Sequence, residues 1–196
     1  AAVLRGSPAM KVRSYGQIVV GGRWQGGAGG TIDVVSPHTE EVIARAAAGS
    51  AHDVDAAVCA ARAAFDDGPW PRMTHAQRIA AVEKLAGVYS THLDDMADLI
   101  TAQMGSPRSF SRLGQAAGAA SMMHLAAQEA RRYPWAERRN GILGEVHLRR
   151  VPVGVVGIII PWNVPQNLLM PKLIPALIAG CTVVVKPAPE TPLDSL

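Results

Sequence analysis

Two polar side chains, those of Asn163 and Lys186, each follow a short apolar run in the last quarter of the sequence. An asparagine amide donates hydrogen bonds from its NH₂ group, and a lysine ammonium carries three donors on a flexible stem. Such groups can bind the oxygen atoms of a ligand, including an oxygen that gains negative charge during a reaction. The alternatives are structural: an asparagine that caps the following helix, and a surface lysine that ends a strand.

The spacing around these two residues predicts one βαβ unit. The run from Val153 to Ile160 has no polar side chain, which is typical of a parallel strand covered on both faces. A helix is expected from Gln166 to Ala179, and a second strand from Thr182 to Val185. In an open parallel sheet, ligands bind beyond the carboxyl ends of the strands, where both polar side chains would lie. The pattern therefore indicates an α/β fold with its ligand site at this edge.

Further strands and amphipathic helices precede this unit, whereas residues 1–16 show little pattern. Three short strands are expected, at Gln17 to Val20, Thr31 to Val35 and Glu41 to Ala47. Four helices are expected to follow, at about 50–67, 74–89, 91–105 and 109–133. The first of these helices would bury an apolar face that includes Val54 and Val58.

The composition is that of an ordinary globular protein, with 48% hydrophobic and 18% charged residues among 196. A net charge of +3 with scattered arginines does not favour nucleic acid binding. No apolar run reaches about 18 residues, so no membrane-spanning helix is expected. Because no basic and apolar leader is visible, cytoplasmic location is the default expectation.

The two cysteines, Cys59 and Cys181, both lie in segments that are expected to be buried. They lack C-x-x-C spacing, so they indicate neither a disulfide framework nor a metal site. The six histidines are spread along the chain with no i, i+4 pair. No metal ligand is expected among them.

Several segments resemble the first part of the nucleotide-binding domain of the aldehyde dehydrogenase superfamily: PVGVVGIIIPWNVP, then Lys172, then AGCTVVVKPAPETP. Pro-Trp-Asn after a Gly-Val-Val-Gly strand, followed by Lys-Pro-Ala at family-like spacing, is a specific combination. The resemblance extends from about Gln17 onward. It implies a Rossmann-like parallel sheet with an N-terminal helical segment, and NAD or NADP as the cofactor. It also implies oxidation of an aldehyde to a carboxylic acid through a thiohemiacetal, hydride transfer and thioester hydrolysis.

The resemblance assigns roles to individual residues. Asn163 matches the family's donor to the oxyanion of the tetrahedral intermediate. Lys186 matches the lysine that hydrogen-bonds the adenosine ribose of the cofactor. Lys172 matches a lysine near the active site, for which proton handling and a helix-surface ion pair both stay open. The segment that runs beneath the nicotinamide half of the cofactor, through backbone and apolar contact, is matched by Ile159, Ile160, Pro161 and Trp162.

The sequence departs from the family pattern in the loop that follows Lys186. Many members carry a glutamate three residues after this lysine, where its carboxylate accepts from both ribose hydroxyls and repels a 2′-phosphate. This chain has Pro189 there and Glu190 one position later. The choice between NAD and NADP therefore stays open, with Glu190 as the substitute carboxylate.

By the same resemblance, residues 17–136 pack on the nucleotide-binding domain, and residues 153–196 form its first, incomplete βαβ unit. Residues 137–152 are expected to form a hairpin that helps to build a homodimer or homotetramer of the full-length enzyme. An ordinary edge strand is the alternative for Leu143 to Arg150.

The general-base glutamate and nucleophilic cysteine segments of the family have no counterpart in this sequence, and neither Cys59 nor Cys181 matches the nucleophile. We therefore expect the N-terminal portion of an aldehyde dehydrogenase whose substrate is a small-molecule aldehyde. The alternative is a truncated, non-catalytic fragment with an assembly or partial nucleotide-binding role.

Overall fold

The computed structural model describes residues 13–196. Its N-terminal part forms five short strands: β1 (Arg13–Tyr15), β2 (Gln17–Val20), β3 (Arg23–Gly26), β4 (Thr31–Val35) and β5 (Val42–Ala47). Strand β5 pairs in parallel with β1 and antiparallel with β4, while β2 and β3 form a separate antiparallel pair. The sequence showed little pattern in residues 1–16. Residues 1–12 of this segment lie outside the described part, whereas Arg13–Tyr15 forms a strand.

A helical region follows, and its elements are α1 (Ala51–Asp66), η1 (Trp70–Arg72), α2 (His75–Ser90), α3 (Leu93–Met104), α4 (Arg108–Phe110), η2 (Ser111–Ala116) and α5 (Ala117–Arg132). Capping boxes start α1 at Ser50 and α2 at Thr74, because each side chain accepts a hydrogen bond from the third helical residue. The expected fourth helix contains a π-helical segment, η2, between α4 and α5.

The structure corrects the expected burial along α1. Val54 and Val58 are 49% and 43% exposed, and Cys59 is exposed as well. Ala57 and Ala61 of the expected face are partly buried, and α1 lies against β9 there, where Thr182 Oγ1 donates to the Ala61 carbonyl at 2.8 Å. Among the described residues, only Asp53 is buried on this helix.

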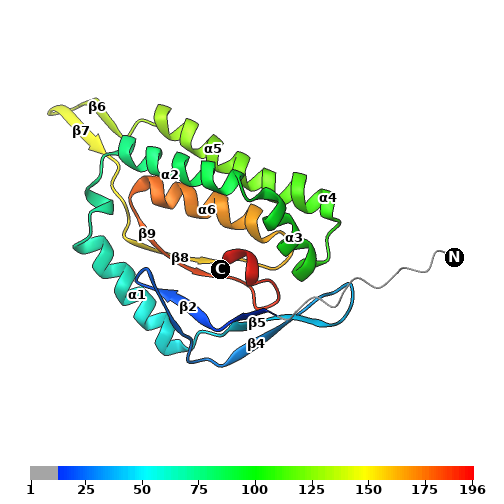
Figure 1. The fold of residues 1–196 in the computed structure, drawn as a ribbon. Helices are drawn as coiled ribbons and strands as arrows, with labels where there is room; N and C mark the ends of the chain where they lie inside the picture. Colours follow the sequence, from blue (N-terminus) through cyan, green and yellow to red (C-terminus); the bar gives the residue numbers. More distant parts are fainter. Residues whose placement is uncertain (1–12) are drawn as a thin grey trace.

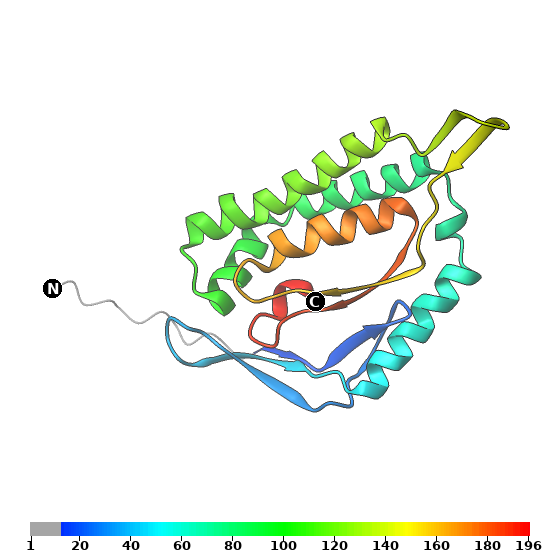
Figure 2. The ribbon, with the colours of Figure 1, turned by 180° about the vertical axis from the view of Figure 1, so that it is seen from behind.

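A hairpin of β6 (Ala136–Gly141) and β7 (Gly144–Arg149) projects away from the rest of the molecule (Figures 1 and 2). The hairpin turn does not lie at Asn140-Gly141, although an Asn-Gly pair often forms a two-residue turn. Asn140 pairs with Glu145 inside the ladder, so the two turn residues are Ile142 and Leu143. Gly144 closes the turn with a φ of 129°, a conformation that favours glycine.

The predicted βαβ unit is present as β8 (Val155–Ile159), α6 (Pro165–Ala179) and β9 (Thr182–Lys186). The two strands are parallel, with Val155 opposite Thr182 and Ile159 opposite Lys186. Strand β8 begins two residues later than expected, because Gly154 has a φ of 123° that is incompatible with an extended strand. A short 3₁₀ turn, η3 (Leu193–Ser195), follows near the described C-terminus.

The largest buried cluster lies between the β8–β9 pair and helices α2, α5 and α6. It includes Ile79 and Val82 of α2, Met123 of α5, Ile174 of α6 and Ile158 of β8. Burying one such side chain contributes roughly 1.5–3 kcal/mol. Figures 1 and 2 show these helices as a layer over one face of the two strands, with α1 and the N-terminal strands on the other side. No helix of residues 13–196 is long and apolar enough to cross a membrane.

The carboxyl end of α6 is closed by donors from η1 and α2. Trp70 Nε1 donates to the Leu177 carbonyl at 3.1 Å. Arg78 is buried, and its Nε donates to the Ile178 carbonyl at 2.8 Å while Nη1 donates to the Met73 carbonyl. A cation beside the last carbonyls of a helix offsets their partial negative charge. The end of α6 is therefore fixed against α2.

Candidate functional site at the strand ends

The carboxyl ends of β8 and β9 meet at one edge of the sheet. Ile159 and Lys186 are opposite each other in the ladder, and Ile160 N donates to the Lys186 carbonyl at 3.2 Å. Two loops leave this edge: residues 160–164 lead into α6, and residues 187–192 lead into η3. The structure thus places the loop of Asn163 beside the strand end that carries Lys186, as the sequence predicted.

The first loop presents both apolar surface and an amide. Trp162 is 54% exposed and Ile159 is 71% exposed, whereas Ile160 is buried in the core cluster. Any contact of Ile160 with a ligand would therefore involve its backbone. Pro161 is exposed beside Trp162.

Asn163 is exposed and forms no side-chain hydrogen bond with the described residues. The N-cap of α6 is Val164, and no side chain caps this helix. The alternative in which Asn163 serves as the helix cap is therefore wrong. Its NH₂ group is left facing solvent, where it is available to a ligand oxygen.

Lys172 reaches back from α6 to the end of β8. Its Nζ donates to the Ile159 carbonyl at 3.3 Å, and no carboxylate of residues 13–196 forms an ion pair with it. The helix-surface ion pair that the sequence left open is thus not formed within the described chain. Its Nζ therefore contacts the residue that directly precedes the exposed loop of Trp162 and Asn163.

The second loop presents a cation and a carboxylate. Lys186 is exposed, and its Nζ has a long 3.4 Å contact with the Pro187 carbonyl. Glu190 is also exposed, and neither side chain is ion-paired within the part of the chain that the structure describes. Both charges are therefore free to meet a ligand.

These side chains fit a dinucleotide. An ammonium and a carboxylate can hydrogen-bond sugar hydroxyls, and an exposed indole and aliphatic side chain can cover a ring. Neither cysteine belongs to this edge. Cys181 is buried at the amino end of β9, opposite the candidate site, and Cys59 lies on α1. Within residues 13–196 there is no group of three or more side chains suited to hold a metal ion.

The sequence analysis missed a buried polar cluster behind this edge. Gln103 Nε2 and Gln166 Nε2 donate to the two carboxylate oxygens of Asp194, at 2.9 and 3.0 Å. Burial raises the pKa of the Asp194 carboxyl to about 6, although the hydrogen bonds from both glutamines act in the opposite direction. The sequence carried no clear signal for this cluster, because a helical glutamine such as Gln166 can be exposed as easily as buried.

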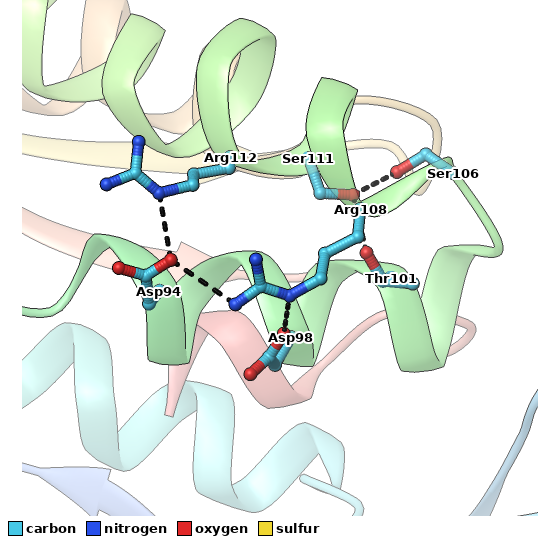
Figure 3. Close-up of polar contacts among 7 residues, drawn as sticks. All are labelled: Asp94, Asp98, Thr101, Ser106, Arg108, Ser111 and Arg112. Atoms are coloured by element: carbon cyan, nitrogen blue, oxygen red, sulfur yellow. Dashed lines mark hydrogen bonds and ion pairs between the residues drawn. The ribbon is translucent and has the colours of Figure 1, made fainter.

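A separate hollow of about 350 Å³ lies between the β4–β5 turn and the α3–α4 corner. Figure 3 shows the ion pairs beside it, in which Arg108 contacts Asp94 and Asp98 and Arg112 shares Asp94. The hydroxyl groups of this corner form hydrogen bonds with each other, since Ser111 Oγ accepts from Thr101 Oγ1 at 2.8 Å. None of the predicted site residues lies here.

Comparisons with known proteins identify one family. A model of the aldehyde dehydrogenase family matches residues 24–196. Aldehyde dehydrogenase 1 of Tanacetum cinerariifolium is 40% identical over 169 residues, which cover 86% of this chain and 34% of that protein. A 3-succinoylsemialdehyde-pyridine dehydrogenase of Pseudomonas is 36% identical over 186 residues, with coverages of 94% and 38%.

Solved structures give the same result. The aldehyde dehydrogenase of Mycobacterium tuberculosis, complexed with NAD+, has a TM-score of 0.89 and 39% identity, and the match covers 93% of this chain and 38% of that one. A Pseudomonas syringae enzyme in complex with NAD+ and octanal has a TM-score of 0.85 and 33% identity. The chain spans about a third of the length of the curated relatives it matches.

Proposed function

This chain belongs to the aldehyde dehydrogenase family, and we propose that the intact protein oxidises an aldehyde to a carboxylic acid with NAD or NADP as hydride acceptor. The observation that carries the proposal is the shared strand edge, where an unpartnered Asn163 amide lies on the loop beside the exposed Lys186. The cofactor supplies the acceptor for the hydride. The residues of this chain bind it and stabilise charge on the substrate.

Asn163 is proposed as the donor to the aldehyde oxygen. This oxygen becomes negative when a nucleophile adds to the carbonyl carbon, and an amide already aimed at it needs no reorganisation during the reaction. The lack of a competing hydrogen bond within residues 13–196 supports this role.

The cofactor contacts are proposed to come from both loops. Lys186 would donate to ribose hydroxyls, with Glu190 as their acceptor. The exposed surfaces of Ile159 and Trp162, the backbone of Ile160 and the ring of Pro161 would lie against the nicotinamide half, and Asn163 would border it. Lys172 is proposed to assist proton transfer near the substrate, because a lysine amine without a carboxylate partner can exchange protons.

Binding of the cofactor is the first test. Isothermal titration of the intact protein with NAD+ should show binding that Lys186→Ala weakens about tenfold, the effect expected for one lost charged hydrogen bond. Lys84→Ala, which removes an exposed lysine from α2, should leave the dissociation constant unchanged. Equal constants for the Lys186→Ala variant and the unaltered protein would contradict the assigned role of Lys186.

Cofactor choice is tested at Glu190. A carboxylate near the ribose repels a 2′-phosphate, so Glu190→Gln should raise kcat/KM for NADP+ relative to NAD+ by roughly tenfold. The ratio is measured with one aldehyde and both cofactors. An unchanged ratio would show that Glu190 lies away from the ribose.

We further propose that the β6–β7 hairpin contacts another subunit, in a homodimer or homotetramer. Ile142 and Leu143 at its tip are fully exposed, which is unfavourable for apolar side chains without a partner. The same exposure favours the second candidate function, a non-catalytic assembly role. In that case the intact protein would associate with other subunits while showing no aldehyde-dependent reduction of the cofactor.

The proposed compartment is the cytoplasm. The two cysteines are not joined in a disulfide, which is the usual state in a reducing compartment. Fractionation of the native host tests this proposal.

A further inference from the structure

The buried carboxylate of Asp194 joins two helices that are far apart in the sequence. Gln103 belongs to α3 and Gln166 to α6, and each donates to a different oxygen of Asp194. Gln166 Nε2 also donates to the Asp194 carbonyl at 2.6 Å, and Gln103 Oε1 accepts from Leu193 N at 2.9 Å. The three side chains are all buried. We call Gln103, Gln166 and Asp194 the carboxylate clasp.

The clasp holds the far end of the loop that starts at Lys186. The near end is held by the hydrogen bond from Ile160 N to the Lys186 carbonyl. Seven residues lie between Lys186 and Asp194, and three of them are prolines with a fixed φ: Pro187, Pro189 and Pro192.

Glu190 lies between these anchors and is exposed, whereas its neighbour Thr191 is buried. Leu193 is buried in the cluster of β4 and β5, together with Val34. With both ends fixed and the backbone restricted, the position of Glu190 depends on where Asp194 is held.

The clasp also reaches the other loop at the strand ends. Gln166 is the second residue of α6 and lies three residues after Asn163. The side chain that holds Asp194 therefore belongs to the same helical turn that ends the Asn163 loop. A change in the clasp would act on both loops at once.

We propose that Gln103, Gln166 and Asp194 are positioning residues, which hold the two strand-end loops in one arrangement so that Lys186 and Glu190 face the same cofactor as Asn163. This inference rests on the proposed function. Directional hydrogen bonds suit the task, because a buried polar network specifies one geometry, whereas apolar packing tolerates several.

The test combines amide hydrogen exchange with NAD+ titration of the intact protein. In Asp194→Ala, exchange should become about tenfold faster in residues 160–164 and in residues 187–193, since hydrogen bonds to a charged group are lost. The dissociation constant for NAD+ should rise by about the same factor. Asp194→Asn should restore only part of both properties, because the side-chain oxygen of asparagine still accepts from one glutamine, whereas its NH₂ group faces the NH₂ group of the other. Asp95→Ala, at an exposed aspartate of α3, should change neither.

If circular dichroism shows that Asp194→Ala is unfolded, Gln166→Leu takes its place. This variant removes the hydrogen bonds from α6 to Asp194 at similar side-chain volume. Faster exchange in residues 187–193 alone, or an unchanged NAD+ affinity when both loops have loosened, would overturn the proposal. Absence of NAD+ binding by the unaltered protein would contradict the proposed function instead. In that case the hydrogen-exchange rates of the two loops alone would test whether the clasp holds them.

Discussion

At the scale of single residues, the candidate site consists of exposed polar groups without ion-pair partners and of buried polar groups with several hydrogen bonds. Asn163, Lys186 and Glu190 form no side-chain ion pair or side-chain cap within the described residues, while Asp194 and Gln166 are buried and hydrogen-bonded. Exposed, unsatisfied polar groups are ready to bind a ligand. Buried, satisfied groups fix the backbone that carries them.

Titration of Asp194 should make the free energy of unfolding depend on pH. Burial raises the pKa of its carboxyl from 3.8 to about 6, so the folded protein binds a proton more tightly than the unfolded chain does. Between about pH 4 and pH 6 the free energy of unfolding should therefore fall as the pH rises, by about 3 kcal/mol, and the loss is complete above pH 6.

Asp194→Asn should remove this slope, as measured by urea unfolding at several pH values. His75 contributes an opposite slope, since burial and the nearby Arg78 lower its pKa, so the variant is compared with the unaltered protein at each pH. Parallel curves for the two proteins would mean that Asp194 does not titrate in this window.

The position of the candidate site residues at the strand ends could be predicted from the sequence, because Pro-Trp-Asn and Lys-Pro-Ala directly follow apolar strands. The clasp could not. Its three residues lie 63 and 28 positions apart in the sequence, and a glutamine in a helix gives no sign of whether it is buried.

At the scale of elements, α6 carries the site at its amino end and is anchored at its carboxyl end by Arg78 and Trp70. The βαβ unit was predictable, because Val and Ile runs flank a helix-length segment that ends at Gly180. The turn at Ile142-Leu143 was not, because the register of the hairpin places the Asn-Gly pair in the ladder. The exposure of Val54 and Val58 on α1 was also missed, since helical spacing does not show where a buried face ends.

Removing the Arg78 side chain should destabilise the protein substantially. Arg78→Met would leave the buried carbonyl of Ile178 and the partly buried carbonyl of Met73 without this donor, at a cost of about 2–4 kcal/mol. Arg72→Ala provides the control, because Arg72 also donates to backbone carbonyls but is exposed, and about 1 kcal/mol or less is expected. Urea unfolding of the intact protein measures both, and equal losses would argue against the anchoring role of Arg78.

At the scale of the whole molecule, two features of the described part are available for contact with further protein: the open strand edges and the hairpin. Strands β8 and β9 pair only with each other within residues 13–196, so each has an open edge. The β6–β7 hairpin extends beyond the body with apolar residues at its tip (Figure 1). Composition and periodicity gave no direct signal for the hairpin's projection, and family resemblance alone suggested its role in assembly.

The hairpin tip should control the oligomeric state. Leu143→Asp places a charge where an apolar contact is proposed, so light scattering after size exclusion should show a smaller assembly, with an unchanged circular dichroism spectrum. Val19→Asp, at a half-exposed valine of β2, serves as the control and should keep the original mass. A Leu143→Asp protein with the original mass would place the subunit contact elsewhere.

The most direct test of the account is the rate of aldehyde-dependent NAD(P)+ reduction by the intact protein and by its Asn163→Ala variant. The unaltered protein should reduce the cofactor only when an aldehyde is present, and Asn163→Ala should lower kcat about 10²- to 10³-fold, as for the loss of one oxyanion donor. Asn140→Ala in the hairpin should retain the full rate. An undiminished rate in Asn163→Ala, or no reduction with any aldehyde of a broad panel, would contradict the account.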